Sequence, residues 1–257
     1  RFLHTADWHL GRIFYGQYLT DDQAHVLENQ FFSILKDEKI DGILLAGDVF
    51  DRAVPPIEAI ELWDSIITRL AMDYKVPLFV VSGNHDGAER LEVGRSMLSR
   101  SGIHIWGSPH HALQPFEFEG ADGKVAICPM PFSESRRIGD ALGFATPSLE
   151  TGLNLHNYDQ MYQAWSNHLR NQVPKGMRSI AISHAFVMGG DVGGSERTLS
   201  VGGSEQVHPQ VFKDFHYTAL GHLHGPQRMG ADYIRYSGSP LKYSFDEHTQ
   251  KKSFTII

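Results

Sequence analysis

The stretch that decides the fold reads Gly42-Ile43-Leu44-Leu45-Ala46-Gly47-Asp48-Val49-Phe50-Asp51-Arg52. Its first five residues form a short apolar run, which is typical of a strand buried on both faces of a parallel sheet. A carboxylate, Asp48, follows almost at once. Loops converge at the carboxyl edge of such a sheet while the strands stay rigid, so this edge is where sites form. The stretch therefore predicts α/β architecture with polar chemistry at the strand end.

The same pattern of an apolar run followed by polar residues recurs along the chain. The polar groups that come after these runs are Asn84-His85, His184 and Gly221-His222-Leu223-His224. The runs before them are Pro77–Ser82, Ser179–Ser183 and Tyr217–Leu220. Near the start, Asp7-Trp8-His9 adds another acid and histidine. We expect all these side chains to meet at one edge of the fold.

Apolar residues at helical spacing predict three helices in the first hundred residues. The first follows Asp21-Asp22, expected as its N-terminal cap, and the third runs from about Glu89 to Arg100. Pro55-Pro56 opens the second. Its apolar stripe consists of Ile60, Trp63, Ile67 and Leu70. Alternation of strands and helices favours an α/β fold.

The second half of the chain has a different pattern. Phe116–Glu119 alternates and Val125–Cys128 returns, which predicts a hairpin. Tyr233–Ser237 and Phe254–Ile257 predict later strands, and a helix is expected over about 158–169. We interpret these strands as a second, mostly antiparallel sheet that packs face to face with the first, with helices on both outer sides.

Composition narrows the functional classes. The 257 residues are 41% hydrophobic and 21% charged, with no apolar run long enough to span a membrane and no leader, so a cytoplasmic protein is expected. With 15 histidines and one cysteine, Cys128, any metal is bound by nitrogen and oxygen. The formal charge of −7 argues against broad nucleic-acid binding, although bound cations would attract a polyanion locally.

The polar clusters suit a two-metal centre. Asp7 and His9 flank Trp8 and can point at one ion, and the carboxylate of Asp48 can bridge two ions. The remaining predicted ligands are Asn84, His184, His222 and His224. Such mixed ligation suits manganese, iron or zinc, and manganese matches the oxygen donors best. Two ions about 4 Å apart can clamp a phosphoryl group.

A second group of residues faces the expected substrate. His85 adjoins Asn84, and we predict that it stabilises developing charge or protonates the leaving oxygen. The carboxylate of Asp51 is placed to orient that imidazole, with a turn or capping role as the alternative. Arg52 is a candidate phosphate contact, and an ordinary surface arginine is the alternative.

In this order, the motifs resemble those of the calcineurin-like metallophosphoesterase superfamily. The matching segments are Asp7–Gly11, Gly47–Asp51, Gly83–Asp86, His184 and Gly221–His224. Within the superfamily, Thr5–Gly11, Val201–Glu205 and Tyr236–Pro240 are similar to the SbcD family, the nuclease subunits of bacterial SbcCD complexes. The resemblance covers nearly the whole chain outside about 133–178.

The resemblance implies an α-β-β-α sandwich formed by residues 1–257 and a manganese-dependent DNA exonuclease and hairpin-processing endonuclease of repair, recombination and replication. One ion would take Asp7, His9, Asp48 and His224, and the other Asp48, Asn84, His184 and His222. The implied partners are DNA, an SbcC-type ATPase and a second copy of the chain. Helices at about 62–70 and 91–98 would form the dimer contact. Arg197 in the glycine-rich stretch Gly189–Gly203 would lie near DNA.

Two departures keep alternatives open. SbcD proteins continue beyond Tyr243–Asp246 into DNA-capping and SbcC-docking regions, which we expect to be absent from this chain. The motifs Gly-Asp-x-x-Asp-Arg and Gly-Asn-His are also similar to those of phosphoprotein phosphatases, although these have Glu where Asp86 stands. The alternatives are therefore a phosphoesterase for small or protein substrates and a metal-free binding scaffold.

Overall fold

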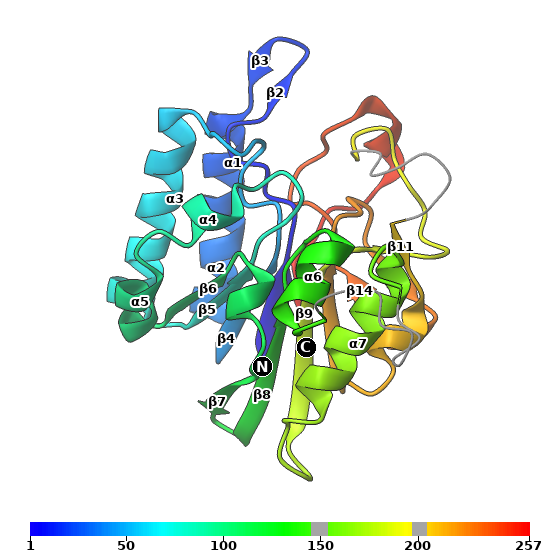
Figure 1. Cartoon of the computed structure of the whole chain (residues 1–257). Helices are drawn as coiled ribbons and strands as arrows, with labels where there is room; N and C mark the ends of the chain where they lie inside the picture. Colours follow the sequence, from blue (N-terminus) through cyan, green and yellow to red (C-terminus); the bar gives the residue numbers. More distant parts are fainter. Residues whose placement is uncertain (145–153, 197–204) are drawn as a thin grey trace.

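The structure, a computed structural model, describes residues 1–144, 154–196 and 205–257. Two mixed β-sheets pack face to face, with helices covering the outer face of each (Figure 1). Helices α1 to α3 lie on the first sheet, at the left of the figure, and α6 and α7 lie on the second. The predicted α-β-β-α sandwich is confirmed.

The first sheet has the strand order β15-β1-β4-β5-β6. Its parallel strands are β1 (Phe2–Thr5), β4 (Gly42–Ala46), β5 (Leu78–Val81) and β6 (Ile103–Trp106). Along β4, Ile43 and Leu45 pack against the helices while Leu44 and Ala46 pack against the second sheet. Because side chains alternate along a strand, a continuous apolar run fills both cores.

The second sheet has the order β13-β14-β12-β9-β8-β7. Its strands are β7 (Phe116–Gly120), β8 (Gly123–Met130), β9 (Arg178–His184), β12 (Tyr217–Gly221), β13 (Gln227–Met229) and β14 (Ala231–Tyr236). The hairpin of β7 and β8 is confirmed. The four central strands are parallel, so the expectation of a mostly antiparallel sheet was wrong. Helices α6 (Ser135–Ala141) and α7 (Tyr158–Arg170) lie between β8 and β9, and a crossover of that kind returns the chain in the same direction.

The last strand, β15 (Thr255–Ile256), also departs from expectation. It pairs antiparallel with β1 in the first sheet, not with the second sheet. The chain thus crosses back between the two halves after β14. This pairing covers an edge of β1 that would otherwise be open, which is a common way to protect a sheet.

The helices of the first half mostly follow their predicted positions. Helix α1 (Thr20–Val26) continues through a π-helical stretch, Leu27–Phe31, into α2 (Phe32–Asp37). Asp21 and Asp22 lie in the first turn and make no capping hydrogen bond, so the predicted cap was wrong. Carboxylates there still favour the positive end of the helix dipole.

Helix α3 (Ile57–Arg69) starts directly after Pro56, as predicted, and leads into a π-helical stretch, Leu70–Tyr74. Of the predicted stripe, Ile60 is 47% exposed, whereas Trp63, Ile67 and Leu70 are buried. The predicted third helix is broken into α4 (Ala88–Leu91) and α5 (Arg95–Leu98). The break falls at Gly94, whose φ of 77° is left-handed and ends a right-handed helix.

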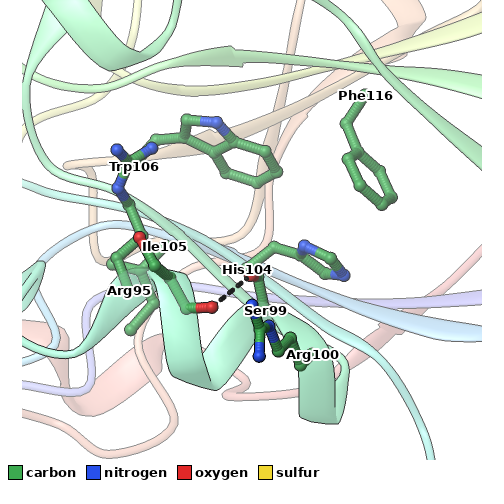
Figure 2. A pocket seen from close by; sticks show the side chains of 8 residues that line it. Arg95, Ser99, Arg100, His104, Ile105, Trp106 and Phe116 are labelled. Atoms are coloured by element: carbon green, nitrogen blue, oxygen red, sulfur yellow. Dashed lines mark hydrogen bonds between the residues drawn. The ribbon is translucent and has the colours of Figure 1, made fainter.

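Short elements complete the described chain. They are β2 (Ile13–Phe14), β3 (Gln17–Tyr18), β10 (Phe186–Val187), β11 (Gln206–Val207) and the 3-10 turns 99–101, 109–111, 209–212 and 245–249. A groove of about 500 Å³ lies beside the edge strand β6, with Arg95, Arg100, His104, Trp106 and Phe116 on its walls (Figure 2). Its lining includes no predicted metal ligand. In the described residues, no helix is long and apolar enough to cross a membrane.

Candidate metal centre

The predicted ligands come together where the carboxyl ends of the two sheets face each other. Asp7 and His9 follow β1, Asp48 follows β4, and Asn84 follows β5. From the second sheet, His184 ends β9, and His222 and His224 follow β12. All of them except Asn84 are buried. Ligand atoms within 4.8 Å of one another form three groups, namely Asp7–His9–His224, His9–Asp48–His85 and Asp7–Asp48–His184.

Asp48 belongs to two of these groups. Its Oδ2 is 3.5 Å from His9 Nε2 and 3.5 Å from His184 Nε2. On one side His9 Nε2 is 3.0 Å from His224 Nε2. On the other side Asn84 Oδ1 is 2.9 Å from His184 Nε2. One carboxylate oxygen therefore faces a nitrogen from each cluster, which is the geometry of a bridging ligand.

The donor atoms fit bound cations. His184 Nδ1 donates to the carbonyl oxygen of Ala46 at 2.9 Å, so its Nε2 carries a lone pair toward Asn84 Oδ1. His222 Nδ1 lies 3.1 Å from the same amide oxygen. Lone pairs that face one another repel unless a cation lies between them. The nitrogen and oxygen donors suit divalent transition metals, and ions held there would polarise a phosphoryl group and activate water.

Burial sets the electrostatics of the centre. It raises the pKa of Asp7, and the nearby charge of Asp48 adds to the effect. Burial acts in the same direction on Asp48, but His184 and His9 beside it hold its pKa below the usual value. Burial also lowers the pKa of His9 to about 4, so its imidazole is neutral at pH 7. Neutral imidazole and ionised carboxylate are the forms that bind metal.

The backbone of the first-sheet ligands is unusual. Asp7, His9 and Asp48 have left-handed φ values of 55°, 46° and 50°. Such conformations are costly for residues with a Cβ and cluster at functional sites. At Gly83 an added Cβ would lie 2.0 Å from Asp48 Oδ1, so only glycine allows this approach.

Sequence comparison with known proteins decides the family. The chain matches the calcineurin-like phosphoesterase family over residues 1–226. The chain belongs to this family. It is 36% identical over 260 residues to SbcD, the nuclease subunit of SbcCD, from Bacillus subtilis (strain 168), covering 100% of this chain and 66% of that protein. The SbcD protein of Staphylococcus epidermidis is 34% identical over 257 residues, with 100% and 65% covered.

The chain thus spans slightly less than two thirds of the length of these curated relatives. Among solved structures, a dimetal phosphatase from Danio rerio aligns with a TM-score of 0.51 and 14% identity, covering 91% of this chain and 85% of that one. At this identity the structural likeness supports the fold alone.

Two residues of the first half, Gln23 and Asp86, hold the backbone of the loops that carry the predicted ligands. The amide Nε2 of Gln23 donates to the carbonyl oxygens of Trp8 at 3.0 Å and His9 at 2.7 Å, while its Oε1 accepts from Gly11 N. Asp86 accepts from the amides of Gly83 at 2.8 Å and Phe50 at 2.9 Å. A lone glutamine on a helix gives no sequence signal for this role. Asp86, in contrast, belongs to the motif Gly83–Asp86.

The predicted pairing of Asp51 with His85 is not what the structure has. His85 Nδ1 donates to the backbone carbonyl oxygen of Asp51 at 2.8 Å. The Asp51 carboxylate instead accepts from Arg12 at 2.9 Å and lies 3.5 Å from His9 Nδ1. The guanidinium of Arg12 draws it away from His85 because charged hydrogen bonds are the stronger ones. The expected carboxylate contact to His85 was therefore wrong.

The candidate phosphate contacts lie at the edge of the site or beyond it. The Arg52 side chain is 47% exposed and its Nη2 is 3.9 Å from Asp51 Oδ2, so it is free to turn toward solvent. Arg197 lies outside the described residues, as do residues 201–204 of the segment Val201–Glu205 that is similar to the SbcD family. Their roles stay predictions.

His224 has partners that sequence reasoning missed. Its ring faces Ser195 and Glu247, and its amide donates to Glu196 Oε1 at 2.9 Å. Burial tends to raise the pKa of Glu247, but hydrogen bonds from His224, Lys252 and Ser195 lower it to about 2. These residues lie 23 or more positions from His224, and their spacing matches no motif.

Proposed function

We propose that this chain is a two-metal DNA phosphodiesterase, a manganese-dependent exonuclease and end-processing endonuclease that works with an SbcC-type ATPase in DNA repair and recombination. The observation that carries the proposal is the placement of Asp48 Oδ2 at 3.5 Å from histidine nitrogens on both sides. Relatives named as nuclease subunits, at 36% and 34% identity, support DNA as the substrate class.

The roles of individual side chains follow from their positions. Asp7, His9, Asp48 and His224 would hold one ion, and Asp48, Asn84, His184 and His222 the other. His85 would donate a proton to the leaving oxygen. Its Nδ1 is occupied by the Asp51 carbonyl, and one of its ring nitrogens lies within 4.8 Å of ligand atoms of His9 and Asp48. Asp51 would act by steadying His9 and Arg12, with Arg52 reaching for a phosphate.

Exposed aromatic rings near the site favour nucleic acid over a small ester. Phe14 of the β2–β3 hairpin lies 4.8 Å from Tyr15 and 5.0 Å from Phe245, between ring centroids. Tyr15 is 79% exposed and Phe245 is 67% exposed. Unpaired bases stack on such rings. Phe245 is two residues from Tyr243, whose ring contacts His9 and His224.

A homodimer is part of the proposal. An apolar groove of about 450 Å³ runs between α3 and the α4–α5 segment. Exposed apolar side chains on α3 and on the α4–α5 segment include Ile57, Ile60, Val93 and Met97. An apolar face of this kind is typical of a protein–protein contact. Sedimentation should show a dimer that Ile60→Asp with Met97→Asp converts to a monomer, and an unchanged sedimentation coefficient would contradict this contact.

The test of the function is cleavage of a linear and a hairpin DNA with manganese, against the same reaction with chelator. We expect cutting that depends on manganese and is lost in His85→Ala. The matched reaction uses bis(nitrophenyl) phosphate, a diester without bases. Hydrolysis of that diester with no DNA cleavage would favour a phosphoesterase for other substrates. Loss of both reactions in the manganese-loaded protein would overturn the enzymatic proposal.

A further inference from the structure

His224 differs from the other histidines of the centre in what lies behind its ring. Its Nε2 faces His9 Nε2 at 3.0 Å, inside the centre. Its Nδ1 faces away, 2.6 Å from Ser195 Oγ and 3.4 Å from Glu247 Oε1. Neither Ser195 nor Glu247 belongs to the predicted ligand set. The ring is thus held between the metal side and a separate polar group.

Glu247 is fully buried and has partners for both carboxylate oxygens. Lys252 Nζ lies 2.6 Å from Oε2, which also accepts from the Tyr243 amide at 3.2 Å. The Ser195 hydroxyl donates to Oε1. A buried carboxylate is stable when a cation and several hydrogen bonds satisfy it in this way. Glu247 is therefore a fixed negative charge behind His224.

The hydrogen-bond donors define the tautomer of His224. The single hydroxyl proton of Ser195 goes to Glu247, so Ser195 Oγ is left to accept from His224 Nδ1–H. In the opposite tautomer, His224 Nδ1 would carry a lone pair instead of a proton. The single hydroxyl proton of Ser195 would then have to serve both that lone pair and the Glu247 carboxylate. Only protonation at Nδ1 satisfies every partner, and it leaves the Nε2 lone pair directed into the centre.

The backbone of His224 is also held, by Glu196 and Lys252. Its amide donates to Glu196 Oε1 at 2.9 Å. Its carbonyl oxygen accepts from Lys252 Nζ at 2.8 Å, so Lys252 contacts both His224 and Glu247. Ring orientation and backbone position are therefore set together, by residues from two distant segments of the chain.

We propose that Glu247, anchored by Lys252 and acting through Ser195, is the positioning residue that fixes His224 as an Nε2 metal ligand. The proposal rests on the proposed two-metal function. Carboxylates behind metal-bound histidines fix the tautomer and raise ligand basicity, and their loss typically weakens metal affinity by about 10- to 100-fold. Glu247 lies on the Nδ1 side of the His224 ring, away from the Nε2 that faces the centre, so its effect passes through His224.

The experiment is a manganese titration of Glu247→Gln by calorimetry, with ion stoichiometry from elemental analysis. We expect one of the two ions to bind about 10- to 100-fold more weakly, and the other as in the unmodified protein. The matched control is Glu92→Gln, because Glu92 makes a carboxylate–histidine contact of 2.8 Å with His111 away from the centre. That variant should give the unmodified isotherm.

A measurement on the unmodified metal-free protein keeps the proposal testable if Glu247→Gln fails to fold. Nitrogen-15 NMR of the histidine rings should show His224 protonated at Nδ1 and unprotonated at Nε2. Protonation at Nε2, or unchanged binding of both ions by a folded Glu247→Gln, would overturn the positioning role while leaving the two-metal function standing. If the unmodified protein binds no manganese, the proposed function itself fails and the positioning role fails with it.

Discussion

The two sheets contribute predicted metal ligands to the same centre but hold them in different ways. On the first sheet, the ligand loops are tied to one another through the backbone, as when the amide of His9 donates to the carbonyl of Asp48 at 2.9 Å. On the second sheet, His224 is held by side chains of Ser195, Glu247 and Lys252. The first-sheet loops are thus fixed by main-chain bonds between the motifs themselves, whereas His224 is fixed by side chains that belong to no motif.

Replacing Asp48, which faces predicted ligands from both sheets, should have the largest effect on metal binding and activity. Asp48→Ala takes away the oxygen that faces both His9 and His184. We expect the protein to lose both ions and phosphodiesterase activity to fall to background, because neither half retains a complete ligand set. Elemental analysis after desalting checks this. Retention of two ions would show that the bridging assignment is wrong.

A change confined to the first half should separate chemistry from metal binding. His85→Ala leaves all seven predicted ligands in place and removes the proposed proton donor. Turnover should fall by roughly a hundredfold or more while two ions remain bound, since general acid catalysis contributes on that scale. The measurements are single-turnover cleavage and ion stoichiometry. Turnover equal to that of the unmodified protein would remove His85 from the mechanism.

The hydrogen bonds that hold the loop after β1 can be weakened without replacing a predicted ligand. Gln23→Ala leaves the buried amide of Gly11 without its partner. It also removes one of two donors from each of the carbonyls of Trp8 and His9, which keep the Tyr243 hydroxyl and the Arg12 amide. The free energy of unfolding should fall by about 1–3 kcal/mol, the usual cost of unsatisfied buried groups. Urea denaturation measures it. Asn29→Ala is the control, because the exposed amide of Asn29 makes hydrogen bonds only to His25. An equal loss of unfolding free energy in Asn29→Ala would contradict a special role for Gln23.

Acid should weaken the contact between the sheets. His4 on β1 is fully buried against Tyr217 and Leu220 of the second sheet, and burial lowers its pKa to about 3. The unfolded chain binds a proton below about pH 6.5 and the folded one does not. Stability is therefore full above pH 6.5 and falls as pH drops toward 3.

The variant that checks this is His4→Gln, unfolded in chelator across this pH range. It should flatten the pH dependence of unfolding free energy by up to about 1.4 kcal/mol per pH unit, the value for one proton. The exposed His110, changed to Gln, should leave the slope as it was. Equal slopes for all three proteins would contradict a neutral buried His4.

The parts of the fold that were predictable share a physical cause. Apolar runs such as Gly42–Ala46 and Leu78–Val81 are strands because only a doubly buried strand needs a continuous apolar sequence. The direction of the second sheet was mispredicted because β8, β9, β12 and β14 are equally apolar in either orientation. Strand direction depends on the crossover helices that connect the strands, and the sequence of a single strand does not indicate it.

The α/β class, the family and the residues proposed as ligands could all be predicted from the sequence, because the motifs lie directly after their strands. The contact of Asp51 with Arg12 and the return of the chain through β15 to the first sheet became visible only in the folded molecule. The same is true of the placement of Glu247 and Lys252 behind His224. The physical reason is that buried charges find partners by proximity in space, and sequence spacing carries no record of which distant residue will supply them.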